Sequence, residues 1–432
     1  MRTETKNPRW LRGRNDVRVL SLGLVLGAGT LFVSIAGGQG QSVLPEVPVT
    51  AAAIPDNEYD SGRNGVPCSA CNFGAGNARI VFSGADNRLW VANIDPQTGN
   101  YNPADGQGLL LDTNAAAPTD FGNGPEWFDS GLGSGFVYTQ YVSGQPQGDT
   151  TARVAVARMV NGAWTITTLS APRGRASPDA TKNPSDSDVY INYVSAPKGN
   201  LYWRKLSDIN TEHELPISHL TDGNSRRWVP DTHKIIFQGH DPADPLVLRD
   251  QIYTYDIDSG ELEQLTNNPK GVLGGMMWRA PEFGNEYAFF TMVKERRQIL
   301  VYRKLPGADG VMRWTIVKTI DSPAELPYFF SPEVLTHNGR SYIFATVSSA
   351  AAFFDRTVPN QIAISGVDPL RLDARLVTND TGTPRLRLDP EYYVTAQGPF
   401  IYYSRLVPET GTNPAISDGV WRVDLGLGPL RP

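Results

Sequence analysis

Short apolar runs separated by turn residues dominate the chain from residue 73 onward. They are rich in Val, Ile, Tyr, Phe and Trp and are bounded by Gly, Asp, Asn, Pro or Ser; examples are Ile80–Phe82, Leu89–Ala92, Phe136–Tyr138, Val189–Ile191, Ile235–Phe237, Ile252–Tyr255 and Tyr342–Phe344. Such runs are typical of β-strands. No window keeps apolar residues at helical spacing over three turns without a Gly or Pro. The pattern therefore predicts an all-β chain.

A tripeptide ending in Pro-Glu or Pro-Asp returns six times in this part of the chain. Its prolines are residues 125, 178, 230, 281, 332 and 390, which stand 51 to 58 residues apart. Each motif is followed by an apolar strand and then by further strands. Four short strands with their connections occupy about 50 residues, which is the period of one β-propeller blade. The repeat predicts a single β-propeller, in which we expect the Pro-Asp or Pro-Glu pair to close the first hairpin of each blade.

The two ends of the repeat predict how the ring closes. Residues 78–112 supply three strands without the motif, and the last unit ends after three strands, with Val420–Asp424. Because an open ring leaves an unpaired sheet edge, a fourth strand is expected from elsewhere. Val47–Ile54 is the candidate. We therefore predict seven four-stranded blades closed by an N-terminal strand, with six blades as the alternative.

The fourth unit carries a recognisable repeat. It reads Trp-Val-Pro-Asp-Thr-His-Lys-Ile-Ile-Phe from residue 228, and then Ile-Tyr-Thr-Tyr-Asp-Ile-Asp-Ser-Gly-Glu-Leu-Glu-Gln-Leu-Thr from residue 252. This unit resembles the repeat of the TolB-like, WD40-like (PD40-type) β-propeller family, and the later units resemble it loosely. Translocation accessories, peptidase propellers and polysaccharide lyases share that repeat. The resemblance implies an architecture and leaves the chemistry open.

The N-terminal segment has the pattern of a targeting signal. Residues 1–18 hold six basic and two acidic side chains, and an apolar run follows from Val19 to Ala36, ending Ser-Ile-Ala. This predicts a cleaved signal peptide over 1–36, with an uncleaved membrane anchor as the alternative. Residues 37–66 are expected to be a linker that includes the closing strand, and 67–430 the propeller. We expect a secreted or periplasmic protein, with no membrane span once the signal is removed.

The cysteines are Cys68 and Cys71, spaced C-x-x-C. A haem attachment site would need His where Asn72 stands, and a zinc site would need further ligands. In an oxidising compartment we expect the two to form a short disulfide.

The charge balance excludes one class of partner. Lys and Arg number 39 against 45 Asp and Glu, a net charge of −6, which argues against a nucleic-acid binder. The chain shows no phosphate-binding loop, dinucleotide fingerprint or G-x-S-x-G motif. The expected partner is a protein or polysaccharide bound at the propeller bowl by a monomer.

The long loops that join second to third strands are expected to surround that bowl. They are Val142–Ala152, Gln238–Gln251, Ser348–Gln361 and Ser404–Gly419. The second holds His240, Asp241 and Asp244, which are candidate ligands for a divalent metal, although Asp-Pro pairs commonly start turns. No other cofactor is expected.

The candidate chemistry rests on the repeated acids and on residues at the inner strands. Glu126, Glu282 and Glu333 are candidate glycosidase acids, and His240 is a candidate base. Around Glu333 the turn falls at Asn338-Gly339, which leaves Glu333 within the strand, a setting similar to the Pro-Glu strands of five-bladed glycosidases. For ligand binding we select Arg227, Trp228, Trp278 and Arg279, because arginines bind acidic groups and tryptophans stack on sugars. Since six copies of an acid favour a structural role, we expect a recognition or scaffold module. The alternative is a carbohydrate-active enzyme, a polysaccharide lyase or glycoside hydrolase.

Overall fold

The computed structural model describes residues 43–49, 56–60, 79–83, 87–95, 97–101, 108–116, 124–130, 133–169, 174–181, 188–196, 199–217, 225–240, 249–352, 355–368, 374–379 and 382–431. All of them belong to one compact unit, Val43–Pro432. The predicted signal peptide and the predicted Cys68–Cys71 disulfide lie outside the described residues.

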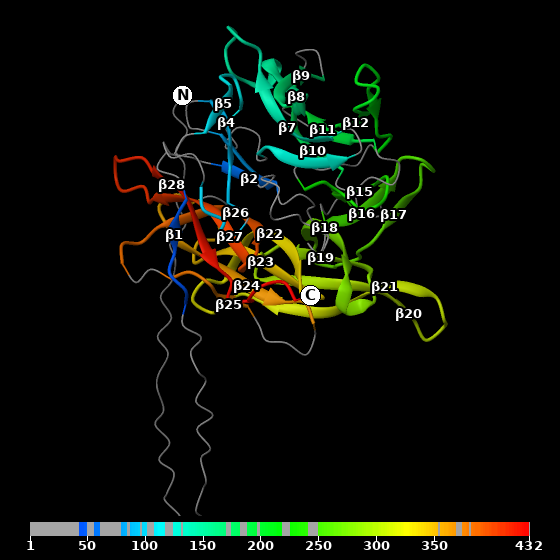
Figure 1. The fold of residues 1–432 in the computed structure, drawn as a ribbon. Coiled ribbons are helices and arrows are strands. Elements are labelled where there is room, and N and C mark those ends of the chain that lie inside the picture. Colours follow the sequence, from blue (N-terminus) through cyan, green and yellow to red (C-terminus); the bar gives the residue numbers. More distant parts are fainter. Residues whose placement is uncertain are drawn as a thin grey trace, which may run out of the picture. The chain divides into compact units, whose positions relative to one another are not determined.

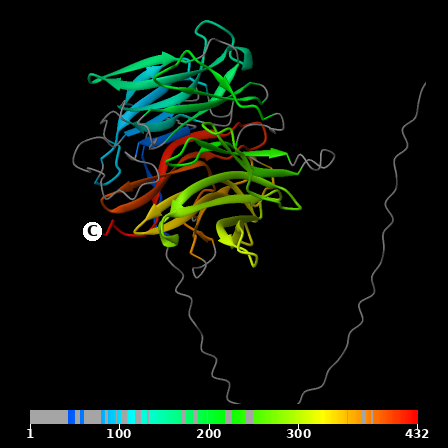
Figure 2. The same cartoon turned by 90° about the vertical axis from the view of Figure 1, so that its right-hand side faces the viewer.

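The described strands form seven antiparallel sheets of four strands each, which we number blades 1 to 7 in the order of their first strands (Figures 1 and 2). The first strands are β2 (Asp56–Asp60), β6 (Glu126–Ser130), β10 (Arg175–Ala180), β14 (Arg227–Trp228), β18 (Val272–Ala280), β22 (Tyr328–His337) and β26 (Leu386–Thr395). The second strands are β3 (Arg79–Ser83), β7 (Gly133–Tyr141), β11 (Tyr190–Ser195), β15 (Lys234–His240), β19 (Glu286–Val293), β23 (Arg340–Ser348) and β27 (Gly398–Val407). The fold is a seven-bladed β-propeller, which confirms the predicted fold class.

The outer half of each blade completes the sheets. The third strands are β4 (Leu89–Asn93), β8 (Ala152–Val160), β12 (Leu201–Lys205), β16 (Asp250–Asp256), β20 (Gln298–Pro306), β24 (Asn360–Gly366) and β28 (Ile416–Asp424). The fourth strands are β5 (Leu109–Asp112), β9 (Ala163–Thr168), β13 (His213–Glu214), β17 (Leu262–Gln264), β21 (Met312–Asp321), β25 (Arg375–Leu376) and β1 (Val47–Pro48). The short helices η2 (Asp149–Thr151) and η3 (Pro281–Phe283) lie in connections. None of the described helices has the length and apolar character needed to cross a membrane.

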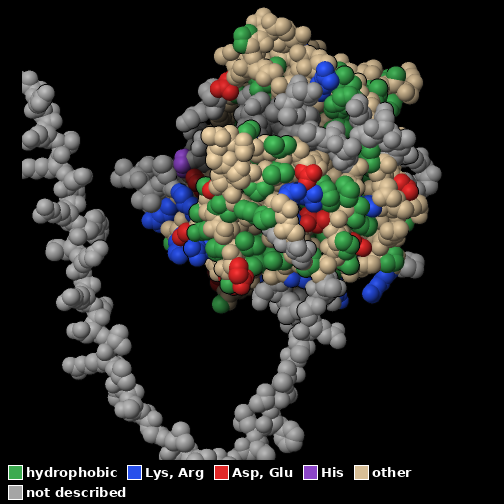
Figure 3. Space-filling model, turned by 90° about the vertical axis from the view of Figure 1, so that its left-hand side faces the viewer, with side chains coloured by type: hydrophobic (Ala, Val, Ile, Leu, Met, Phe, Trp, Pro, Cys, Tyr) green, Lys and Arg blue, Asp and Glu red, His purple; other side chains and the backbone are tan. Residues whose placement is uncertain are grey.

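The apolar runs fold as strands because the blades bury both of their faces against their neighbours. Phe290 and Val301 of blade 5 pack with Ile343 of blade 6 in one core cluster. Tyr190 of blade 3 packs with Phe237 of blade 4 in another. Strands buried on both sides read as continuous apolar runs rather than as an alternation. On the face drawn in Figure 3, small groups of acidic and basic side chains stand among hydrophobic and uncharged ones.

The N-terminal strand closes the ring, as predicted. In β1, Val47 pairs with Arg422 and Pro48 with Trp421 of β28, and the backbone N–H of Val49 donates to the carbonyl of Val420 at 2.8 Å. Figure 1 shows this blue strand beside the red β28. The last blade therefore takes three strands from the C-terminal part of the chain and one from the N-terminal part.

A buried ion pair lies beside the closing strand. The Arg387 guanidinium, only 1% exposed, donates from Nε and Nη2 to the two Glu46 carboxylate oxygens at 2.7 and 2.8 Å. The Tyr403 hydroxyl donates to the same carboxylate. We call Glu46, Arg387 and Tyr403 the clasp, because they join the N-terminal segment to blade 7.

The first strand of blade 1 lies where the sequence analysis expects a linker. Asp56–Asp60 forms β2, which pairs with β3 from Asp56↔Ser83 to Asp60↔Arg79. β2 also contacts β26, the first strand of the last blade, and β6, the first strand of the second blade. The first strands of these three blades therefore lie next to one another where the ring closes. The propeller thus begins before residue 67.

Candidate functional site

The Pro-Asp and Pro-Glu motifs occur in two different structural settings. In blades 4 and 5 they lie in the connection after the first strand: Pro230 and Asp231 follow β14, and Pro281 and Glu282 are in η3. There the prediction that the pair closes the first hairpin holds. In β10, β22 and β26, however, the motif lies within the first strand, and in blade 2 it starts β6. For blades 2, 3 and 7 the prediction is wrong. In blade 6 the sequence itself indicates a turn at Asn338-Gly339 with Glu333 inside the strand, and the pairing His337↔Arg340 confirms it.

Within the strands the motif forms a β-bulge. The register shifts between Ala176 and Asp179 in β10, and equivalent shifts occur in β22 and β26. The residue before each proline has a positive φ: 51° at Ser177, 43° at Ser331 and 53° at Asp389. A bulge inserts a residue and turns the side chains that follow it. Since a positive φ is costly for a residue other than glycine, the surrounding blades must hold this geometry in place.

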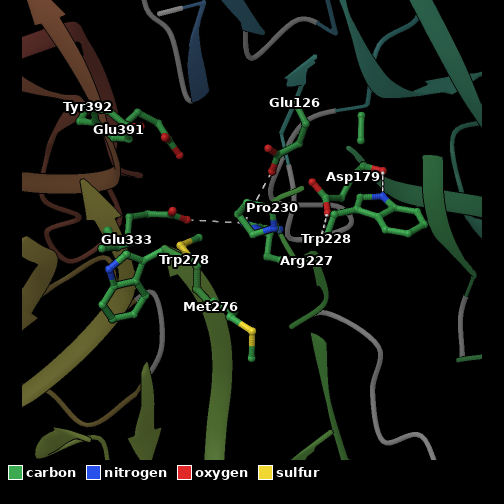
Figure 4. A pocket seen from close by; sticks show the side chains of 13 residues that line it. Glu126, Asp179, Arg227, Trp228, Pro230, Met276, Trp278, Glu333, Glu391 and Tyr392 are labelled. Carbon is green, nitrogen blue, oxygen red and sulfur yellow. Dashed lines mark hydrogen bonds and ion pairs between the residues drawn. The ribbon is translucent and has the colours of Figure 1, made fainter. Parts of the chain in front are cut away.

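The residues that end these bulges, and their equivalents in the other blades, line one pocket. Six successive blades each contribute one such residue: Glu126, Asp179, Arg227, Met276, Glu333 and Glu391. The remaining lining is mostly apolar and comes from Ala180, Trp228, Pro230, Met277, Trp278, Val334 and Tyr392. The pocket encloses about 700 Å³, including space open to solvent. Figure 4 shows the acidic side chains pointing toward the same space.

Arg227 is the central cation of this pocket. Its Nη2 lies 3.6 Å from Glu126 Oε1 and 3.6 Å from Glu333 Oε1 (Figure 4). Burial lowers the pKa of Arg227, but the carboxylates of Glu126, Glu333, Asp179 and Glu391 outweigh it and raise that pKa above its usual range. The guanidinium is therefore positively charged at every physiological pH.

Asp179 connects blade 3 to blade 4. Its Oδ2 accepts hydrogen bonds from the backbone N–H of Trp228 at 3.0 Å and from Asn192 Nδ2 at 3.2 Å. The Trp228 indole N–H points to the Asp179 carbonyl at 3.4 Å. Because the Asp179 side chain is buried and bonded on two sides, it fixes the position of Trp228 at the pocket wall.

Among the described residues at the pocket, carboxylates outnumber guanidinium groups. Four carboxylates, those of Glu126, Asp179, Glu333 and Glu391, face the guanidinium of Arg227. The neighbouring Arg226 is buried, and burial lowers its pKa below the usual value. The charge of Arg227 acts in the same direction, whereas the charges of Asp179 and Glu126 raise that pKa. These four described carboxylates and the two arginines, of which Arg226 lies behind the lining, carry a formal charge of −2.

Five of the residues that the sequence analysis selects meet in this pocket: Glu126, Arg227, Trp228, Trp278 and Glu333. They come from four different blades, and they converge because the ring brings the first strands of its blades together.

Glu282 and Arg279 are placed elsewhere. Glu282 accepts hydrogen bonds from the backbone N–H of Ser341 at 3.2 Å and from its hydroxyl at 2.8 Å. That hydroxyl also accepts the Trp278 indole N–H at 2.9 Å. Arg279 donates from Nε to Asp231 Oδ2 at 2.8 Å, at a site where both side chains are 43% exposed. Both residues connect blade 5 to a neighbouring blade.

His240 ends β15, and its Nδ1 lies 3.1 Å from Asp250 Oδ1. The other two candidate metal ligands, Asp241 and Asp244, are outside the described residues. Within the described ranges, no group of three or more His, Cys, Asp or Glu side chains is arranged to hold a metal ion. The parts of the four long loops that the structure describes contribute no residue to the pocket lining.

Of the six residues at the bulge positions, three are not selected by the sequence analysis: Asp179, Met276 and Glu391. The signal for two of them is present, because Asp179 and Glu391 are the third residues of Ser-Pro-Asp and Asp-Pro-Glu motifs. Met276 follows Gly274-Gly275, which resembles no other bulge sequence. Its equivalence appears only from the register shift between Leu273 and Met276.

No family model matches the chain, and no curated protein matches it in sequence. Among solved structures, it is similar to an oligogalacturonate lyase from Vibrio parahaemolyticus, at 9% identity over 88% of this chain and 92% of that one, with a TM-score of 0.46. A periplasmic gluconolactonase from Pseudomonas aeruginosa matches at 14% identity over 85% and 97%, with a TM-score of 0.43. TolB from Acinetobacter baumannii matches at 14% identity over 81% and 80%, with a TM-score of 0.39. At these identities the likeness concerns the fold alone, and the fold is that of a β-propeller.

Proposed function

We propose that this chain is a recognition module that binds a protein or glycan ligand in the pocket lined by its first strands. The observation that carries the proposal is the convergence of one such side chain from each of six successive blades on a single pocket. Ligand sites in proteins are typically concave and mostly apolar, with a few polar groups that fix orientation. This pocket combines both, with aromatic and thioether walls around a charged centre. The predicted N-terminal signal would place the ligand outside the cytoplasm.

The arrangement of charges favours binding over acid catalysis. A glycosidase needs one carboxylic acid that carries a proton beside a second that is ionised. Here Glu126 and Glu333 share one guanidinium, with 3.6 Å between Arg227 Nη2 and each carboxylate. The same cation thus faces both carboxylates. The bulge in β22 also holds the Glu333 side chain in a fixed direction, as a pre-organised binding site requires.

A carbohydrate-active enzyme is the second candidate. The observation that favours it is the presence of Glu126 and Glu333 in one pocket with Trp228 and Trp278, since tryptophan is a common partner of sugar rings. In a lyase, Arg227 would face the carboxylate of an acidic sugar.

Peptide and glycan arrays probed with the purified full-length chain test the proposal. Met276→Trp places a bulky ring in the pocket without changing its charge, and Met312→Trp makes the same exchange at a half-exposed position on β21. We expect array binding to fall at least tenfold in the first variant and to stay unchanged in the second. Equal binding by both variants would contradict a site in this pocket. Release of reducing or unsaturated sugar ends by the wild type, lost in Met276→Trp, would establish the enzyme instead.

A further inference from the structure

We propose that the pocket binds an organic cation, the guanidinium or ammonium group of a basic peptide side chain; this inference rests on the proposed recognition function. Three features of the pocket support this ligand: the charge of its acidic side chains, the guanidinium of Arg227 that it already holds, and its aromatic and thioether lining.

The charge of the pocket calls for a cation. The four carboxylates and two guanidinium groups sum to a formal charge of −2. Glu126 and Asp179 are at most 7% exposed, and the Glu333 side chain is 19% exposed. A carboxylate shielded from water is costly unless positive charge lies near it. A positively charged ligand would therefore be attracted to the described acids of this pocket.

Arg227 shows which kind of cation the pocket accommodates. Its guanidinium lies between the carboxylates of Glu126 and Glu333, which come from blades on either side of it in the chain. At 3.6 Å these contacts are longer than the 2.7 to 2.9 Å typical of a charge-assisted hydrogen bond. The pocket thus accommodates a guanidinium group between carboxylates of two other blades.

The walls favour an organic cation over a metal ion. Trp228, Trp278, Met276 and Tyr392 line the pocket around the acids. Aromatic faces attract guanidinium and ammonium groups, and thioethers pack well against alkyl chains. A hard metal ion needs several oxygen ligands within about 2.6 Å of one point. The described part of the chain shows no such group of ligands.

Isothermal titration with a blocked tripeptide, acetyl-Gly-Arg-Gly-amide, tests the inference on the full-length chain. The matched probe replaces arginine by citrulline, which has nearly the same shape without the charge. We expect the arginine peptide to bind at least tenfold tighter than the citrulline peptide, and to lose affinity as salt rises. Glu333→Gln and Glu391→Gln should each weaken arginine-peptide binding by about tenfold, since hydrogen bonds to charged groups have that magnitude. Glu295→Gln, an exposed acid on another part of the ring, should leave binding unchanged.

Arg227→Gln separates a cation site from an anion site. If the pocket binds cations, removing its own cation tightens binding of the arginine peptide. If Arg227 instead binds the carboxylate of an acidic ligand, the wild type binds galacturonate oligomers and does not bind the arginine peptide. In that case Arg227→Gln abolishes binding of the oligomers. Thermal unfolding shows whether each variant is folded. If Arg227→Gln is not folded, Glu391→Gln is the variant that tests the inference.

Agmatine, a free guanidinium compound, distinguishes the two sources of such a cation. Weaker binding of agmatine than of the peptide supports a peptide ligand, and equal binding assigns the site to free amines. Equal affinity for the arginine and citrulline peptides would overturn the inference. An array ligand that is neutral or acidic, yet sensitive to Met276→Trp, would overturn it while the recognition function stands. Binding that neither Met276→Trp nor the charge variants alter would overturn both.

Discussion

Removing Glu46 from the clasp should destabilise the closed ring, because it leaves the Arg387 guanidinium buried without its carboxylate. Arg387 is 1% exposed and gives Glu46 two hydrogen bonds, at 2.7 and 2.8 Å. Breaking a buried ion pair by removing one partner costs about 3 to 5 kcal/mol. Arg387 keeps a hydrogen bond of 2.6 Å to the Asn360 carbonyl, so we expect Glu46→Ala to lie near the lower limit, about 3 kcal/mol.

This magnitude converts into a measurable shift of the unfolding temperature. An unfolding entropy of about 2.1 cal/mol/K per residue, over the roughly 390 residues of Val43–Pro432, turns 3 kcal/mol into about 4 °C. Differential scanning calorimetry of wild type and Glu46→Ala at pH 7 measures it. Glu286→Ala, which breaks a surface pair of 3.0 Å with Arg303, is the control and should give no measurable shift. Equal unfolding temperatures for wild type and Glu46→Ala would refute the role of the clasp.

The same pair predicts a pH dependence with a definite sign. Burial raises the pKa of Glu46, but hydrogen bonds from Arg387 and Tyr403 and the charges of Arg387 and Arg405 lower it below its usual value. The stabilisation is therefore present above the unfolded-state pKa of about 4.3 and is lost as the pH falls through the lower folded-state pKa. The difference between wild type and Glu46→Ala should shrink as the pH is lowered from 6 toward 3.

Three further substitutions test separate parts of the account. Asp179→Ala leaves the buried N–H of Trp228 without its acceptor and should cost about 1 to 3 kcal/mol in the free energy of unfolding, measured with urea. Burial lowers the pKa of His337, whose ring nitrogen bonds the Gly428 carbonyl at 2.8 Å. The folded state therefore favours the neutral imidazole, and the stability that this gives is lost as the pH falls below about 6.5. His337→Gln should reduce the drop in unfolding temperature between pH 7 and pH 5. Glu282→Ala should lower stability and leave ligand binding unchanged, and a loss of binding by a stable Glu282→Ala protein would contradict its placement outside the pocket.

The architecture follows from the sequence because a propeller repeats its local rules. The period of the motif predicts the blade, and the missing strand after Val420–Asp424 predicts closure by the N-terminal segment. The first strand of blade 1 could not be predicted in this way. Asp56–Asp60 reads Asp-Asn-Glu-Tyr-Asp, which has no apolar alternation. Its pairing with Arg79–Ser83 is a long-range contact that a local pattern does not encode.

The site was predictable only in part, because one tripeptide serves two structural roles. Ala280-Pro-Glu282 and Ser331-Pro-Glu333 look alike in sequence. Glu282 lies in a turn and accepts hydrogen bonds from Ser341, whereas Glu333 follows a bulge and lines the pocket. The backbone decides between them, through the positive φ of 43° at Ser331. The Asn338-Gly339 turn predicts that Glu333 lies inside a strand, but no local signal predicts that its side chain lines the pocket.

Photo-crosslinking tests most directly the central claim that the pocket lined by the first strands is the binding site. The probe is the blocked arginine peptide carrying a benzophenone, irradiated with the full-length chain and mapped by mass spectrometry. The account predicts crosslinks at Met276 and Met277, which line the pocket, and their loss when unlabelled arginine peptide is added in excess. Crosslinks confined to the exposed Met312 on β21, or to the long loops between second and third strands, would contradict it.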